Sequence, residues 1–436
     1  MAQAPISMTR GSEGAPQSAG LMASLVVGLF FIWGFSTVLV DTLIPKLKAL
    51  FSLSFTEVML AQFAFFIAYF LVSVPAGRLL AKIGYVRGIV AGLVIMAIGG
   101  LMFAPAASLG LFPAFLAALF VLASGITILQ VAANPLIAIL GDPARSHSRL
   151  TLAQAFNSLG TTIGPWVGAV LILKGMVALP SADTLSPVAL AALRRTEAQM
   201  VQVPFLGIAA VLLAMAAVFW ALRNWKGAPQ TEGAQAGPSS LALITANPRL
   251  ALGVASIFAY VGAEVSIGSV MANYLMQPTT LGLAALEAGK LISLYWGGAM
   301  IGRFLGAGVL RYVSPGKVLA ACALMAGALA ATSGLSTGML AAISLIAIGL
   351  FNSIMFPTIF SLGIEGLGRD TAKGSGLLCM AIVGGAVVPL ATGVVADHLG
   401  LSLALFVPVV CYGVIAAFGW FARKPAVARG LASTGA

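Results

Sequence analysis

Charged residues are scarce in this sequence. Only 8% of its 436 residues are Asp, Glu, Lys or Arg, whereas 60% are hydrophobic. A soluble domain carries about 25% charged residues. The shortage of charge therefore excludes a soluble protein, and the mean hydropathy of +1.05 predicts a membrane protein that crosses the bilayer several times. Its 50 glycines are typical of closely packed transmembrane helices.

Cysteine and histidine are also rare. The three cysteines, Cys322, Cys379 and Cys411, are scattered through apolar segments and form no disulfide or metal-binding pattern. The two histidines, His147 and His398, stand near helix ends. The sequence has no phosphate-binding P-loop, zinc-binding helix or nucleophile elbow. We therefore expect no enzyme, no resident cofactor and no metal site, and any energy that the protein uses would come from an ion gradient and not from ATP.

Acidic residues are outnumbered, because 12 Asp and Glu stand against 23 Lys and Arg, for a net charge of +11. The basic residues gather in alternate loops, and 17 of the 23 lie on the side of the two termini. This distribution indicates membrane topology and argues against nucleic acid as a partner. The positive-inside rule predicts that both termini are cytoplasmic. We expect a monomer in the lipid of a bacterial inner membrane.

Twelve apolar segments follow a polar tail, and each is long enough to cross a bilayer as a helix. Residues 1–20 lack the apolar core of a signal peptide and predict a disordered tail. The loop 223–249, rich in Gly, Pro, Ser and Gln, predicts a cytoplasmic linker between bundles at 21–222 and 250–422, and 423–436 predicts a cytoplasmic tail. The expected spans are 21–45, 57–80, 88–106, 112–140, 150–173, 203–222, 250–276, 287–310, 317–334, 338–364, 374–396 and 401–422.

Short motifs recur in the two halves of the chain at offsets of 222 to 225 residues. Near-constant offsets indicate a parallel duplication. The predicted fold class is therefore an all-α membrane protein with twelve transmembrane helices in two six-helix pseudo-repeats. Substrate sites in this layout lie between the halves, near the middle of the membrane. The matching residues are Gly77-Arg78 with Gly302-Arg303, Pro135 with Pro357, and Pro165 with Pro389.

Two acidic residues lie well inside apolar spans. Asp41 belongs to the first span and Glu264 to the seventh, which are equivalent in the two halves. A charge at the centre of a bilayer costs roughly 2.5–3.5 kcal/mol, so burial favours the neutral form of each acid. An acid that a proton or another cation can neutralise suits ion-coupled transport, and Asp41 is the stronger candidate. The alternative is a structural carboxylate bonded to a neighbouring helix.

Amide side chains recur on the faces of otherwise apolar helices. Gln130 and Asn134 lie four residues apart and share one helix face. Gln154 and Asn157, three apart, do the same on the next helix. Buried amides need partners, so they bond across helices or bind a ligand rich in hydroxyl groups. Aromatic rings beside amides resemble a sugar site. The further candidates are Trp33, Thr37, Tyr260, Asn273, Asn352 and Phe356, with Trp166 and Trp296 as additional flat surfaces.

Several charged residues lie near the ends of the predicted helices. Arg78 and Arg303 are expected to pair between helices or with the carboxylates of nearby turns, which are Asp142, Glu365 and Asp370. Asp142 and His147 fall in a short turn, and we expect both side chains to be solvated.

Five stretches resemble the fucose–proton symporter branch of the major facilitator superfamily, which includes bacterial glucose/galactose permeases. They are FFIWGFSTVLVDTLIPKL, AANPLIAILG, SRLTLAQAFNSLG, AYVGAEVSIGS and FPTIFSLGIEGLGRD. The resemblance extends from Leu21 to Phe421 and implies two six-helix bundles around a central sugar cavity. It further implies that Asp41 is the functional acid of the first helix. The amides that the resemblance places near the sugar are Asn134, Gln154 and Asn157.

The sequence departs from the fucose permeases at three places. Gln130 stands where they carry a second glutamate, and Glu264 stands where they carry a glutamine. Thr37 and Val38 replace a pair of asparagines. These departures favour the glucose/galactose side of the branch, which is linked to sodium as well as to protons.

We therefore expect a secondary active transporter that imports a monosaccharide, a glucose/galactose-like hexose, by symport with a proton or sodium. The alternatives are a symporter of fucose or an N-acetylhexosamine, a drug-type exporter, and a membrane sensor that does not transport. Four amides and two acids argue against a cavity for hydrophobic compounds, and no signalling domain is visible. The expected partners are the sugar, the coupling cation and membrane lipid.

Overall fold

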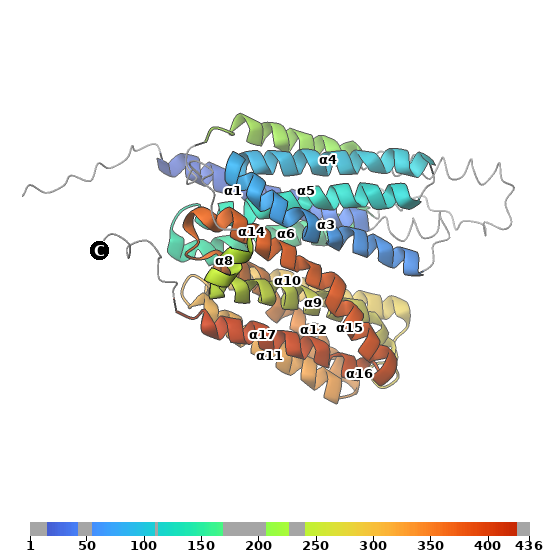
Figure 1. Cartoon of the computed structure of the whole chain (residues 1–436). Coiled ribbons are helices and arrows are strands. Elements are labelled where there is room, and N and C mark those ends of the chain that lie inside the picture. Colours follow the sequence, from blue (N-terminus) through green and yellow to red (C-terminus); the bar gives the residue numbers. More distant parts are fainter. Residues whose placement is uncertain (1–14, 42–54, 110–111, 169–205, 226–239, 425–436) are drawn as a thin grey trace, which may run out of the picture.

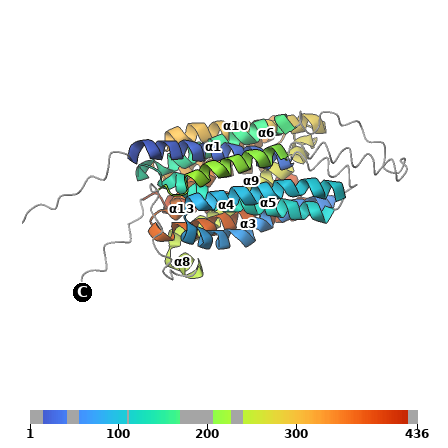
Figure 2. The same cartoon turned by 90° about the horizontal axis from the view of Figure 1, so that it is seen from above.

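The structure is a computed structural model, and it describes residues 15–41, 55–109, 112–168, 206–225 and 240–424. Within these residues every regular element is a helix, and the long helices lie side by side along one direction (Figure 1, Figure 2). Helix α1 (Ala15–Asp41) begins and helix α17 (Phe406–Phe421) ends at the same end of the bundle. We call this the terminal end; it lies on the left of Figure 1.

The first half of the chain contributes long helices. Gly84, with a φ of 82°, makes the turn between two of them, α3 and α4, in a conformation that suits glycine. Helices α4 and α5 approach so closely that a Cβ at Gly99 or Gly125 would collide with the backbone of the other helix, as is typical of membrane helices. The helices are α1, α3 (Phe55–Ile83), α4 (Tyr85–Leu109), α5 (Phe112–Ile139), α6 (Ser146–Gly168) and the unlabelled Leu206–Ala221, with a 3-10 turn at Pro143–Arg145.

The second half contains more and shorter helices. Proline opens α9 and α11, at Pro248 and Pro315, where its missing N–H has no helical partner to lose. The helices are α8 (Ser240–Ala246), α9 (Pro248–Met276), α10 (Ala285–Val309), α11 (Pro315–Leu335), α12 (Gly338–Asn352), α13 (Met355–Ile364), α14 (Thr371–Met380), α15 (Gly384–Leu399), α16 (Leu401–Ala404) and α17, with 3-10 turns at Gly368–Asp370 and Ala381–Val383.

Eight helical segments of the described residues are long and apolar enough to cross a membrane. The shorter apolar helices Gly20–Ser36 and Leu206–Ala221, together with α6 and α10, fall on the four remaining predicted spans. Large apolar side chains such as Leu305, Leu390 and Val410 are more than 60% exposed, which suits a surface covered by lipid. The prediction of an all-α membrane protein with twelve transmembrane helices is confirmed.

The predicted spans 338–364 and 374–396 are broken helices and not single ones. The first divides at Ser353–Ile354 into α12 and α13, and the second divides at Ala381–Val383 into α14 and α15. Pro357 follows the first break. Proline lacks the N–H that would bond the carbonyl four residues earlier, so the helix loosens there. For Pro357 that carbonyl belongs to Ser353, at the break itself, whereas Pro389 lies inside α15, beyond the second break.

The two halves meet closely at the terminal end. A Cβ on Gly77 of α3 would touch the Ala372 carbonyl of α14 at 2.8 Å, and one on Gly376 would touch the Ser73 carbonyl at 2.6 Å. Helix α6 reaches α10 in the same region, where Ser148 Oγ donates to the Ala307 carbonyl at 2.6 Å. The structure is therefore closed between the halves at the terminal end.

Candidate functional site

Glu264 lies on α9 in a group of aromatic side chains. Its Oε1 accepts a hydrogen bond from the Tyr260 hydroxyl at 2.7 Å, because residues four apart share one helix face. The Tyr260 ring lies 6.4 Å from the Phe356 ring of α13, centre to centre. Tyr260 is buried and Glu264 half-buried. The structure thus brings together three of the residues that the sequence singled out.

Asn352 links two buried tyrosines beside this group. Its Nδ2 donates to the Tyr295 hydroxyl and its Oδ1 accepts from the Tyr412 hydroxyl, both at 2.8 Å. Asn352 is fully buried, so in this structure it orients the two rings. Tyr295 and Tyr412 both interact electrostatically with Glu264.

The first half holds an equivalent pair. Gln130 Nε2 of α5 donates to the Tyr69 hydroxyl of α3 at 2.6 Å. Gln130 and Asn352 are 222 residues apart, and Tyr69 and Tyr295 are 226 apart, close to the offsets of the duplication. Sequence reasoning missed these tyrosines. A tyrosine inside an apolar span needs a hydroxyl partner, and its recurrence at the repeat offset was the available signal.

The amides of α6 are partly or fully buried, and Asn157 faces the first helix. Asn157 Nδ2 donates to the Phe30 carbonyl of α1 at 3.0 Å, and Gln154 is 6% exposed. Trp33 is also buried, with its ring 5.3 Å from the Phe30 ring. Asn157 therefore holds α6 against α1 in this structure.

Asn134 stands apart from the other amides. It is fully buried on α5, and neither of its amide atoms has a hydrogen-bond partner among the described residues. A buried polar group without a partner costs about 1–3 kcal/mol. An amide left in this condition fits a residue that finds its partners in another conformation or with a ligand.

Arg303 pairs between helices, which is one of the two roles that the sequence predicted for it. Its Nη1 donates to Ser158 Oγ of α6 in the other half, and its Nε donates to the Ser353 carbonyl at 3.2 Å. It also interacts electrostatically with Glu264. The turn carboxylates, which were the alternative partners, form ion pairs with other cations: Asp142 with Arg145, Glu365 with Arg249 and Asp370 with Lys373.

The remaining candidates are more exposed or lie outside the described side chains, although the Trp296 ring lies 5.1 Å from the Tyr295 ring, centre to centre. Asn273 is exposed on α9, nine residues and roughly 14 Å beyond Glu264. Trp296 is 44% exposed. Asp41 is the last residue of α1, and its side chain and those of Thr37 and Trp166 lie outside the described part of the structure.

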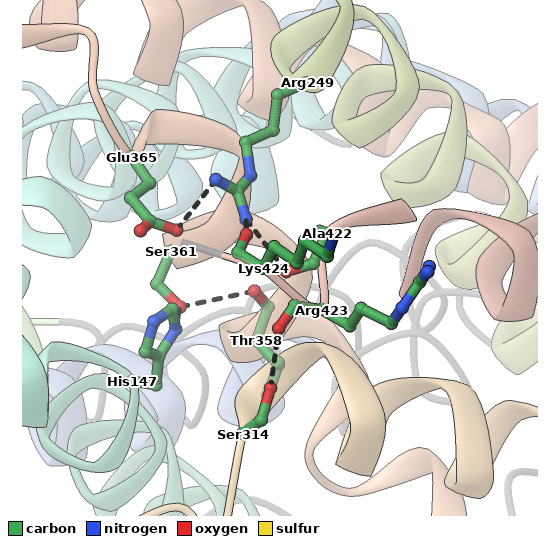
Figure 3. A network of polar contacts seen from close by, with 9 residues as sticks. All are labelled: His147, Arg249, Ser314, Thr358, Ser361, Glu365, Ala422, Arg423 and Lys424. Atoms are coloured by element: carbon green, nitrogen blue, oxygen red, sulfur yellow. Dashed lines mark hydrogen bonds and ion pairs between the residues drawn. The ribbon is translucent and has the colours of Figure 1, made fainter. Parts of the chain in front are cut away.

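A polar network seals the terminal end between the halves (Figure 3). His147 Nδ1 of α6 and Ser361 Oγ of α13 lie 2.6 Å apart. His147 is 8% exposed, so the expectation that it is solvated is wrong, whereas Asp142 is exposed as expected. Burial, followed by the nearby Arg249 and Arg149, lowers the pKa of His147 to about 4. The ring is therefore neutral in this closed state at neutral pH.

A cavity of about 1020 Å³ adjoins His147 at the terminal end. Both halves line it: Tyr85 and His147 belong to the first half, and Arg249 and Glu365 belong to the second. Arg249 pairs with Glu365 at 3.3 Å and donates to the carbonyls of Ala422 and Lys424. The ion pair of Arg249 and Glu365 is therefore attached to the residues that follow α17. Within the described residues, no group of His, Cys, Asp or Glu is arranged to hold a metal ion.

Comparisons with known proteins agree with this architecture. Residues 25–381 match the family model of the Major Facilitator Superfamily. The chain is 49% identical to a glucose/galactose transporter of Brucella abortus over 91% of this chain and 92% of that protein. It is 35% identical to the L-fucose-proton symporter of Escherichia coli over 92% and 93% of the two chains.

A solved structure shares the fold closely. The crystal structure of the transporter FucP in the outward conformation superposes with a TM-score of 0.87 at 34% identity, and the match covers 94% of this chain and all of that one. This agreement confirms the predicted layout of two six-helix pseudo-repeats. The chain therefore belongs to the Major Facilitator Superfamily, in the branch that holds the glucose/galactose transporters and fucose–proton symporters.

Proposed function

We propose that this protein imports a glucose/galactose-like hexose together with a proton. The observation that carries the proposal is the Glu264 group: a half-buried carboxyl bonded to Tyr260 and set against the ring of Phe356. A carboxyl in an apolar helix can hold and release a proton, and an aromatic ring beside it can pack on the C–H face of a sugar. The similarity to glucose/galactose transporters over nine-tenths of both chains supports the same function.

The amides would recognise the sugar hydroxyls. Asn157 and Gln154 on α6 belong to one half, and Phe356 and the tyrosines of Asn352 belong to the other. A hexose between them would be held from both halves, as the fold requires for alternating access. Asn134, whose amide lacks a partner here, would join the site when the halves move. Asn352 and Gln130 would act through the tyrosines that they orient.

A proton is the proposed coupling ion. One relative is named an L-fucose-proton symporter, whereas sodium has no such support. Glu264 is our first candidate for the proton site, because its carboxyl group is half-buried in an apolar helix and bonded to the Tyr260 hydroxyl. Asp41 is the second, by resemblance to the functional acid of the fucose permeases.

The terminal end is proposed to face the cytoplasm of a bacterial cell, with both termini inside and the protein a monomer in the inner membrane. The basic loops support this orientation, because 17 of 23 Lys and Arg lie on that side. The structure, closed at the terminal end, would then face outward. The linker 223–249 would join bundles at 21–222 and 250–422, with tails at 1–20 and 423–436.

Uptake by proteoliposomes tests the proposal. Labelled glucose, galactose, fucose and N-acetylglucosamine are offered separately, each with an imposed proton gradient, an imposed sodium gradient or none. We expect glucose or galactose to accumulate with the proton gradient alone. Accumulation of fucose alone would move the substrate to the fucose side of the branch. No accumulation of any sugar under either gradient would overturn the proposed function.

A further inference from the structure

Arg303 is a cation held inside the bundle where the two halves meet. It is half-buried on α10 and donates to Ser158 of α6, the residue that follows Asn157. Its second bond goes to the Ser353 carbonyl, at the break between α12 and α13. A charge at this depth is costly, so three features around it indicate what it does.

The first feature is the carbonyl that Arg303 binds. Pro357 has no N–H for the Ser353 carbonyl, which is therefore free to accept another donor. The first half has the same arrangement, because Pro135 frees the carbonyl of Val131. There Ser375 Oγ, which comes from the other half, donates to Val131 at 2.9 Å. The Val131 carbonyl thus bonds directly to the other half, whereas the Ser353 carbonyl is linked to the other half through Arg303, which also bonds to Ser158.

The second feature is a hydroxyl without a partner. At the offset of 224 residues that relates Pro165 to Pro389, Ser375 corresponds to Thr151 of α6. By the same duplication, Val131 corresponds to Ser353. Thr151 Oγ1 is buried and has no hydrogen-bond partner among the described residues. If the two halves were identical, Thr151 would donate to the Ser353 carbonyl. Arg303 donates to this carbonyl in its place.

The third feature is the charge of Glu264. Arg303 binds the Ser353 carbonyl, three residues before Phe356, whose ring lies 6.4 Å from that of Tyr260, the partner of Glu264. At this separation Arg303 also interacts electrostatically with Glu264. The two charged groups nevertheless form no ion pair in the described structure, where Arg303 is held by Ser158 and Ser353. The attraction of a carboxylate for a guanidinium is strong where water is excluded. An ionised Glu264 would therefore compete with Ser158 and Ser353 for Arg303.

We infer that Arg303 is a positioning residue that sets how tightly Glu264 holds its proton, by binding Ser158 while the terminal end is closed and turning to Glu264 when that end opens. This inference rests on the proposed function. Closure and proton binding then favour each other, since coupling between two equilibria is reciprocal. Glu264 takes up a proton in the closed state and releases it at the terminal end after opening. When Arg303 leaves, the Thr151 hydroxyl donates a hydrogen bond to the Ser353 carbonyl.

Sugar exchange at equal pH on both sides tests this inference, because exchange needs only the loaded carrier and fails when the proton is lost. Arg303→Gln removes the competing cation, so we expect the pH at which exchange falls by half to rise by one unit or more. Ser158→Ala frees Arg303 to approach Glu264, so we expect the same midpoint to fall. Arg303→Lys keeps the positive charge, so we expect its exchange midpoint to lie near that of the wild type. It serves as the second variant if Arg303→Gln folds poorly.

Arg311→Gln is the matched control. Arg311 follows α10 and its Nε donates to Ser148 of α6 at 3.4 Å, so this variant also loses an arginine between the halves, two turns away from Arg303. We expect its exchange midpoint to remain that of the wild type. Midpoints that move in the same direction in Arg303→Gln and Ser158→Ala, or do not move at all, would overturn the inference while wild-type accumulation still supports the proposed function. A wild-type protein that accumulates no sugar would overturn the function itself.

Discussion

The two halves of this protein repeat one plan with different chemistry. Each has an amide bonded to a tyrosine, Gln130 with Tyr69 and Asn352 with Tyr295. In the first half the helix around the amide is unbroken, and its freed carbonyl accepts from a neutral serine. In the second half the helix breaks, and its carbonyl accepts from an arginine near Glu264.

Under the proposed function, this difference gives the halves different emphases. Around its amide, the described interior of the first half offers neutral amides and hydroxyls, which suit contacts with a sugar. The described interior of the second half adds a carboxyl group, Glu264, and a guanidinium, Arg303. We therefore expect changes in the second half to disturb proton coupling more than changes in the first half do.

Replacing the acids of the two equivalent spans, Glu264 and Asp41, is the sharpest way to break the comparison. We expect Glu264→Gln to abolish accumulation of sugar against a gradient while exchange continues, because a permanently neutral side chain cannot release a proton. Uptake and exchange in proteoliposomes measure the two activities. Asp41→Asn is the equivalent change in the first half. It is expected to have the same effect if both acids take part in proton coupling. Accumulation lost only in Asp41→Asn would place coupling in the first half and contradict our assignment.

The amide pairs are expected to differ in stability. Asn352→Ala leaves two tyrosine hydroxyls without a partner, whereas Gln130→Ala leaves one. Each unpaired buried group costs about 1–3 kcal/mol. We therefore expect the larger fall in the midpoint of thermal unfolding in detergent for Asn352→Ala. An equal or larger fall for Gln130→Ala would show that the number of tyrosine hydroxyls left without a partner does not set the loss of stability.

Much of the fold could be predicted from the sequence, because long apolar runs and alternating basic loops depend on composition alone. The acid in span 7 and its neighbour Tyr260 could be found for the same reason: a polar side chain in an apolar helix stands out, and residues four apart share a face. The duplication was visible in prolines and glycines, whose backbone effects preserve their spacing.

The contacts between halves could not be predicted. Arg303 looked like a residue of a helix end, and only the three-dimensional structure shows that it meets Ser158, which is 145 residues away. His147 lies in a polar stretch of sequence, yet the second half covers it through Ser361. Such burial depends on how two distant segments pack, and no local pattern records it. The breaks at Ser353 and Ala381 likewise needed tertiary support, since Pro135 does not interrupt α5.

Removing the bond between Ser375 and the Val131 carbonyl should loosen the closed terminal end moderately. A hydrogen bond contributes about 0.5–1.5 kcal/mol, so we expect Ser375→Ala to open roughly 2- to 13-fold more often. Cys379, fully buried one turn further along α14, reports the opening through its rate of reaction with a thiol reagent in a protein whose other two cysteines are serine. Ser344→Ala, which changes a buried serine of α12, is the control. Labelling no faster than in this control would contradict a closing role for Ser375.

The smallest expected effect is a pH dependence of closure through His147. Its pKa is lowered to about 4 in the closed state, first by burial and then by Arg249 and Arg149, against an ordinary value of about 6.5. The closed state therefore has its full stability above pH 6.5 and loses it as the pH falls toward 4. Between pH 7.5 and 6.5 we expect about a twofold rise in opening. The measurement is the rate of Cys379 labelling relative to His147→Gln at each pH, since this variant cannot titrate there. A constant ratio would show that His147 stays buried when the terminal end opens.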